Sequence, residues 1–88
     1  MMIGKLAEIK DENIPAYNGR PAIKKKIVTV DFLNGESAAI EFLGELRRLI
    51  IRGFKVGDTV DVEYIKKVNK NRSGKLFNNL KATSIKRL

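Results

Sequence analysis

The sequence predicts a small all-β protein in which five strands form a β-barrel, with one short helix between strands 3 and 4. Three observations lead to this prediction. Apolar and polar residues alternate over several short stretches, as they do in strands with one buried face. The pair Asn34-Gly35 separates two of these stretches and is typical of a tight β-hairpin turn. Between Gly44 and Arg52 the apolar spacing changes to that of a helix.

The first 22 residues predict one strand followed by a long loop. Residues 2–10 alternate weakly, and Gly4 would permit a bend or bulge in this strand. Residues 11–22 contain both prolines and the pair Asn18-Gly19, with little periodicity. A loop of this length in so small a domain is often functional.

Residues 24–43 predict a hairpin whose two strands present matching apolar faces. These faces are expected to form the core of the barrel, together with Tyr64 from the fourth strand. The apolar residues of the hairpin are Val28, Val30, Phe32, Ala38, Ile40 and Phe42.

Residues 44–52 predict a short helix, because their leucines and isoleucines form an apolar stripe at helical spacing. Gly53 suits the left-handed conformation that often ends a helix. Phe54 is expected to cover the barrel beside the helix. The basic residues of the helix lie off the stripe and are expected to be solvated: Arg47, Arg48 and Arg52.

The last third of the chain predicts two further strands joined by a loop. A fourth strand alternates over residues 60–65, and a polar loop that contains a glycine follows at residues 68–75. Residues 76–88 predict the fifth strand. Its alternation slips between Ala82 and Ile85, which indicates a β-bulge.

Five strands with a helix between the third and the fourth are the order of a five-stranded OB-fold. OB-folds bind oligonucleotides or oligosaccharides across strands 2 and 3 and through the loops 1–2 and 4–5. Other small barrels are the alternative. Among them, SH3-like barrels lack a helix at this position, so the apolar stripe in residues 44–52 favours the OB-fold.

Positive charge is concentrated at one end of the chain. The 88 residues include 18 Lys and Arg and 10 Asp and Glu, for a net charge of +8. Residues 1–63 contain ten of each sign, whereas residues 64–88 contain eight basic residues and no acidic one. Such segregation points to an anionic polymer as partner. Residues 1–88 are therefore expected to form a single OB-fold nucleic-acid-binding domain.

Cysteine and histidine are both absent. Their absence removes thiolate nucleophiles, disulfides, the usual zinc ligands and the most common proton-transfer group near neutral pH. No serine lies in a recognisable nucleophile setting, so we expect no enzyme activity, no catalytic residue, no metal site and no cofactor. No apolar run approaches the ~20 residues that span a membrane, and no secretion leader opens the chain. We therefore expect a cytoplasmic protein without a membrane partner.

The run Ala39–Val68 resembles the central stretch of bacterial single-stranded-DNA-binding proteins. In that family a strand ends in an apolar-aromatic-glycine group, a helix follows, and a Gly-Asp/Ser turn opens strand 4. The positions with this pattern are Phe42-Leu43-Gly44, Glu45–Arg52 and Lys55-Val56-Gly57-Asp58-Thr59-Val60. Two further runs resemble the glycine turn before the fifth strand and the opening strand of short single-OB relatives: Ser73-Gly74-Lys75-Leu76-Phe77 and Ile3-Gly4-Lys5-Leu6.

The resemblance implies non-specific binding of single-stranded DNA, favoured over RNA, and assembly into a homo-oligomer. Two features of the family are missing: the stacking tryptophans, since the chain has no Trp, and the acidic tail, since the sequence closes on Ile85-Lys86-Arg87-Leu88. The resemblance therefore supports the fold and the ligand class more strongly than a role in DNA replication.

Binding of a single strand without sequence preference needs cations along the phosphates and flat side chains on which bases stack. In an OB-fold the predicted first loop and second strand would form one rim of the groove, and the predicted 4–5 loop and fifth strand the other. The predicted nucleic-acid-binding residues are Tyr17, Arg20, Lys24, Lys25, Lys26, Lys70, Arg72, Lys75 and Phe77. Tyr17 and Phe77 have the alternative of packing within the fold, and the three consecutive lysines that of protecting a strand edge.

Two other functions fit the same sequence. An RNA-binding OB module, of the ribosomal or translation-factor kind, would have the same composition, because nothing in the residues separates ribose from deoxyribose. A protein–protein adaptor would instead present an exposed apolar patch, for which Ile27, Ile51 and Ile65 are the candidates. The same three residues would also serve to join copies of the chain.

Overall fold

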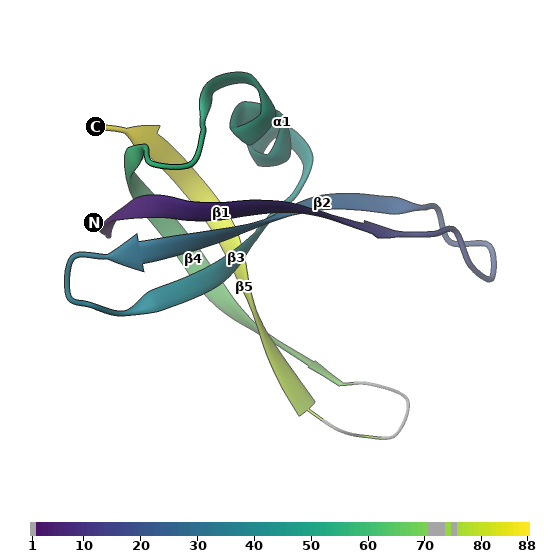
Figure 1. The fold of residues 1–88 in the computed structure, drawn as a ribbon. Helices are drawn as coiled ribbons and strands as arrows, with labels where there is room; N and C mark the ends of the chain where they lie inside the picture. The colour runs from purple at the N-terminus through teal and green to yellow at the C-terminus, as the bar shows by residue number, and fades with distance from the viewer. Residues whose placement is uncertain (1, 71–73, 75) are drawn as a thin grey trace.

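The computed structural model describes residues 2–70, 74 and 76–88 (Figure 1). The elements are β1 (Ile3–Ile14), β2 (Ile23–Phe32), β3 (Ser37–Phe42), α1 (Gly44–Gly53), β4 (Thr59–Lys70) and β5 (Leu76–Arg87). The strands form one closed sheet in the order β1-β2-β3-β5-β4, with β4 pairing back to β1. The predicted small all-β fold, with one helix between the third and fourth strands, is confirmed.

Two long strand pairs extend beyond the closed part of the sheet. The two seams that complete the closure are short: β1 pairs with β4 over residues 3–5 and 59–61, and β3 pairs with β5 over residues 40–41 and 80–81. The β1–β2 and β4–β5 ladders are much longer. Each therefore projects from the closed body as a two-stranded arm, and Figure 1 shows both arms leaving the body on the side away from the chain termini.

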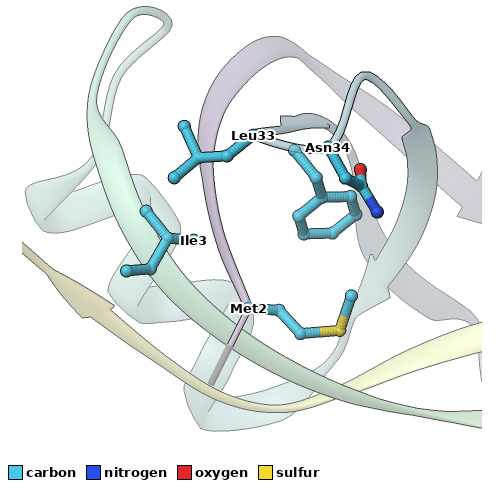
Figure 2. A pocket seen from close by; sticks show the side chains of 5 residues that line it. Met2, Ile3, Leu33 and Asn34 are labelled. Carbon is cyan, nitrogen blue, oxygen red and sulfur yellow. The ribbon is translucent and has the colours of Figure 1, made fainter.

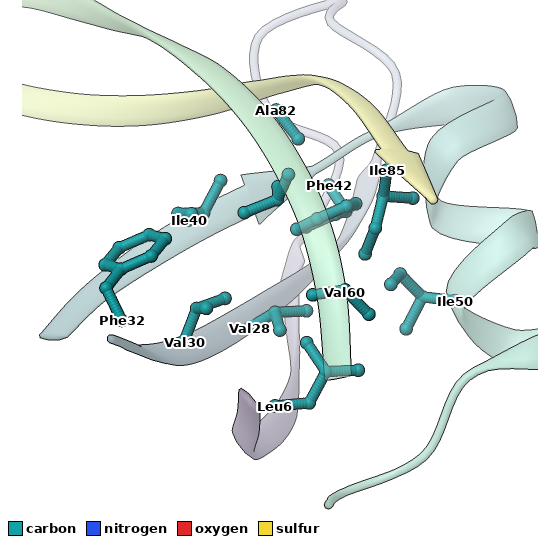
Figure 3. Close-up of a cluster of buried hydrophobic side chains, with 11 residues drawn as sticks. Leu6, Val28, Val30, Phe32, Ile40, Phe42, Ile50, Val60, Ala82 and Ile85 are labelled. Carbon is teal, nitrogen blue, oxygen red and sulfur yellow. The ribbon is translucent and has the colours of Figure 1, made fainter. Parts of the chain in front are cut away.

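The closed body surrounds an apolar core (Figure 3). Val28 and Val30 of β2 meet Ile40 and Phe42 of β3 there, and all four side chains are fully buried. The predicted core face of this hairpin is thereby confirmed, and Tyr64 packs against it as a partly buried side chain. The other core residues are Leu6, Phe32, Ile50, Val60, Val62, Ala82 and Ile85. Burial of apolar surface, worth about 25 cal/mol per Å², thus stabilises the body.

The helix α1 is held to the body mainly through Ile50, which is fully buried. Phe54 packs against the core just beyond the helix, as predicted. The prediction of a left-handed Gly53 is wrong, because the chain leaves the helix directly into an extended residue, Phe54, with φ of −128°. The left-handed glycine is Gly44 at the start of the helix, with φ of 56°.

A β-bulge bends β1, but not at the glycine where the sequence permitted one. The register with β2 shifts between Leu6 and Glu8, so Ala7 is the extra residue. Gly4 is required for a different reason. A Cβ at this position would lie 2.6 Å from the carbonyl oxygen of Asp31, closer than any side chain tolerates without a backbone shift.

A second bulge lies in β5, where the slip in alternation predicted it. The register with β4 shifts so that Thr83 is the extra residue between Ala82 and Ser84. Because of this extra residue, Ala82 and Ile85 both reach the core although they lie three positions apart.

Candidate nucleic-acid interface

The β1–β2 arm replaces much of the loop predicted at residues 11–22. β1 continues to Ile14, β2 begins at Ile23, and these two residues are partners in the ladder. Residues 10–24 are all exposed, so no buried apolar face marks the extended strands in the sequence. The alternation test detects half-buried strands and misses one that is solvated on both faces.

The tip of this arm is a tight turn between Tyr17 and Arg20. The N–H of Tyr17 donates to the carbonyl of Arg20 over 3.2 Å, and the N–H of Arg20 donates to the carbonyl of Tyr17 over 2.9 Å. Between them Asn18 and Gly19 both have positive φ, 49° and 76°, as a type I′ turn requires. Both predicted binding residues are exposed at the end of the arm, Tyr17 by 61%.

The three consecutive lysines divide between the two faces of the arm, because successive side chains of a strand point to opposite faces. Val28 of the same strand is buried in the core, so Lys24 and Lys26 share its face. Lys25 lies on the outer face together with Ile27.

Lys25 lies in a hollow of about 470 Å³ on the outer face of the sheet. Side chains from four strands line it, at the place where both arms leave the body. The lining residues are Glu12, Lys25, Ile27, Ala39, Glu41, Asn79 and Leu80. The hollow therefore joins the base of the β1–β2 arm to the base of the β4–β5 arm, with β3 as its floor.

Lys25 is already paired inside this hollow. Its Nζ lies 2.6 Å from Oε1 of Glu41, and the two side chains are only 12% and 17% exposed. Glu12 is the partner of Lys25 in the β1–β2 ladder. Among the described lining residues, one lysine thus stands against two carboxylates, and a phosphate that reaches Lys25 has to compete with Glu41.

On the other face of the arm, Lys26 pairs with Asp11, with 2.6 Å between Nζ and Oδ1. The hydrogen bond from Lys26 holds the pKa of the Asp11 carboxyl below its usual range, against an opposing effect of burial. The charges of Lys26 and Arg47 lower this pKa further. Lys24 forms no ion pair with any residue that the structure describes.

Arg47 departs from the sequence prediction of a solvated side chain. It is partly buried, and its charge acts on Asp11 of the neighbouring arm. Its Nε is buried and has no hydrogen-bond partner among the described residues. The apolar stripe does not predict this burial, because Arg47 lies off the stripe.

The β4–β5 arm contains the remaining predicted binding residues. Lys70 and Phe77 belong to its strands. The side chains of Lys70 and Phe77, and the whole of Arg72 and Lys75, lie outside the part of the chain that the structure describes.

Two basic residues beside the hollow were not predicted from the sequence, Lys67 on β4 and Lys81 on β5. Lys67 is the ladder partner of Asn79, which lines the hollow, and Lys81 follows Asn79 by two positions on the same face. Lys81 also stands opposite Glu41 in the β3–β5 seam. Only the pairing of β4 and β3 with β5 places these two lysines beside the hollow, and the composition of the chain does not reveal that pairing.

Comparisons of the chain with protein-family models, with curated proteins and with solved structures find no match. The candidate site therefore rests on its residues and its geometry. Within the described residues, no helix has the length and apolar character needed to cross a bilayer. The same residues contain no cluster of three or more potential metal ligands.

A separate hollow of about 280 Å³ lies beside the N-terminus and the β2–β3 turn, on the side of the body away from the arms in Figure 1. Figure 2 shows its lining side chains from close by. It is lined by Met2, Ile3, Phe32, Leu33 and Asn34, and Leu33 is 81% exposed. None of these side chains is charged, so this hollow offers no cation to a phosphate group.

Proposed function

We propose that this chain is an OB-fold protein that binds single-stranded nucleic acid, DNA in preference to RNA, in the hollow between its two arms. The observation that carries the proposal is the position of the hollow. It crosses β2 and β3 and lies between the β1–β2 and β4–β5 connections, the region through which OB-folds bind oligonucleotides. The five-stranded closed sheet with a helix between β3 and β4 supports the OB-fold assignment.

The two rims of the hollow supply the cations that a phosphate backbone requires. Lys25 lines the hollow at the base of the β1–β2 arm, and Lys67 and Lys81 lie beside it on β4 and β5. The excess positive charge of residues 64–88 falls on β5, the second half of β4 and the connection between them. A nucleic-acid strand between the two arms would thus have positive charge on both sides, from two distant parts of the sequence.

The surfaces available for base stacking are modest. Ile27 and Ala39 give the floor of the hollow a small apolar area, and Tyr17 presents an exposed ring at the tip of one arm. Base–aromatic stacking contributes about 1–3 kcal/mol per base, and every base has a stacking face. With no Trp in the chain, we expect modest affinity and little sequence preference.

Salt dependence follows from the phosphate contacts. For single strands, log affinity falls with log salt by about 0.7 for each neutralised phosphate, so four or five contacts give a slope of about −3. Binding is then expected to weaken roughly 60-fold between about 50 and 200 mM salt.

The test is fluorescence anisotropy of labelled oligo-dT, oligo-U and duplex DNA at three salt concentrations. Lys25→Gln/Lys67→Gln removes one charge from each side of the hollow and should weaken oligo-dT binding and flatten its salt slope. The matched control, Lys5→Gln/Lys86→Gln, removes the same charge from exposed positions outside the lining of the hollow and should change binding less. Equal affinity for duplex DNA would contradict single-strand binding, and tighter binding of oligo-U would make the RNA module the better description. No binding to any of the three would favour the adaptor.

A further inference from the structure

A third hollow, of about 550 Å³, lies where α1 ends and β5 finishes. It is built by the end of the helix, the connection from α1 to β4, and the last residue of β5. The lining residues are Arg52, Gly53, Phe54, Lys55, Asp58 and Arg87. Figure 1 shows this end of β5 beside the α1–β4 connection and far from the arm tips, and no lining residue is shared with the hollow between the arms.

Positive charge dominates this hollow. Three cationic side chains, Arg52, Lys55 and Arg87, meet one carboxylate, Asp58, which is 15% exposed. Oδ2 of Asp58 already accepts the backbone N–H of Lys55 over 2.9 Å and Nη2 of Arg87 over 3.3 Å. Within the described residues, the side chains of Arg52 and Lys55 form no ion pair. Like charges brought together in this way repel each other, and a bound anion relieves that repulsion.

Arg87 is held in place before any ligand arrives. Its guanidinium lies over the ring of Phe54, 5.1 Å from the ring centre, and its Nη2 also pairs with Oδ2 of Asp58. The side chain is nevertheless 55% exposed. A guanidinium has five N–H donors in a fixed fork that suits the oxygens of a phosphate, and only one of them contacts Asp58.

We propose that this hollow is a second anion site, which binds a phosphate group through Arg87, Arg52 and Lys55. The phosphate belongs either to a free phosphorylated small molecule or to a nucleic-acid strand long enough to extend beyond the hollow between the arms. The first source is independent of the proposed function, whereas the second rests on it.

Pyrophosphate tests the site directly, at constant ionic strength, by the backbone amide signals of the labelled protein. In the wild type, the amides of Gly53, Phe54, Lys55 and Asp58 should shift in a saturable way. Arg52→Gln/Lys55→Gln alters two exposed side chains and should weaken this binding at least 10-fold while the remaining spectrum stays folded. The control Lys10→Gln/Lys86→Gln, with the same loss of charge elsewhere, should bind as the wild type does.

An absent or non-saturable shift would overturn the site, as would equal binding by Arg52→Gln/Lys55→Gln and the wild type. Two lengths of oligo-dT then separate the sources of the phosphate. If a strand supplies it, a long oligomer shifts these amides and a short one does not. If oligo-dT fails to bind anywhere while pyrophosphate still binds, the proposed function fails and the anion site stands.

Discussion

The closed body and the arms use the same strands but are stabilised by different interactions. Along β2, Val28 and Val30 are fully buried in the body, whereas Ile23, in the arm, is 46% exposed. The arm is held by its ladder of backbone hydrogen bonds and by ion pairs such as Lys26–Asp11. One strand, β2, therefore contributes to the core at one end and stays exposed to solvent at the other.

The difference has a dynamic consequence. A two-stranded hairpin alone is at best marginally stable in water, and local opening is easiest where few apolar contacts are buried. The arms should therefore open more readily than the body.

The largest expected effect comes from emptying the core. Phe42→Ala removes a fully buried ring and should lower the free energy of unfolding by about 3–5 kcal/mol. Ile14→Ala, on the arm, removes a side chain that is 42% exposed and should lower it by less than about 1 kcal/mol. Urea unfolding followed by circular dichroism compares the two. Similar losses of free energy of unfolding would mean that the arm is packed as tightly as the core, and would contradict the difference in stability between body and arm.

Substitution of two glycines of the closed body by alanine should change the free energy of unfolding in opposite directions. Gly4→Ala places a Cβ against the Asp31 carbonyl and should destabilise the protein by about 1–3 kcal/mol. Gly53→Ala meets no atom within 4 Å and lies at the end of a helix, so it should be neutral or stabilise by up to about 1 kcal/mol. Thermal unfolding of both variants measures the two effects. A neutral Gly4→Ala would contradict the close approach of β1 and β2.

At the hollow, Glu41 pairs with Lys25, so a phosphate bound there would have to compete with Glu41. Glu41→Gln frees this lysine, so oligo-dT binding should tighten and the salt slope should steepen by about 0.7, the value of one additional phosphate contact. Glu36→Gln removes the same charge from the exposed β2–β3 turn and is the matched control. Anisotropy titrations at several salt concentrations give both slopes. An unchanged slope for Glu41→Gln would show that Lys25 takes no part in binding.

The smallest expected effect concerns pH and the Asp11–Lys26 pair. Because the pKa of Asp11 is lower in the folded protein, its ion pair stabilises the arm above the pKa of the unfolded chain and is lost as pH falls through the folded value. Carboxyl NMR should find Asp11 titrating below its ordinary range in the wild type and higher in Lys26→Gln. Titration at the same pH in both proteins would contradict the ion pair. Asp11 is exposed, so global stability should change little.

The sequence predicted the body well because each of its elements carries a local signal. Asn34-Gly35 specified the hairpin, the apolar stripe specified α1, and the slip after Ala82 specified the bulge at Thr83. Gly53 misled because a glycine after a helix permits a left-handed residue without requiring one. The chain instead leaves the helix through the extended residue Phe54, which packs on the core.

The arms and the hollow were predictable only in part. Once Lys24, Lys25 and Lys26 are assigned to a strand, the alternation of side chains predicts that Lys25 lies on the opposite face from Lys24 and Lys26. The ion pairs with Glu41 and Asp11 depend on the strand register, which no single segment encodes. The extension of β1 to Ile14 leaves no apolar pattern, because both faces of the arm are solvated.

Amide chemical-shift mapping with oligo-dT most directly tests whether a single strand lies between the arms. We expect saturable shifts at the residues where the two arms meet β3, and none around the apolar hollow at Leu33. The shifted residues should include Lys25, Ile27, Ala39, Glu41 and Asn79. Shifts confined to the Leu33 end of the body, or none at any strand concentration, would mean that the hollow is not where nucleic acid binds.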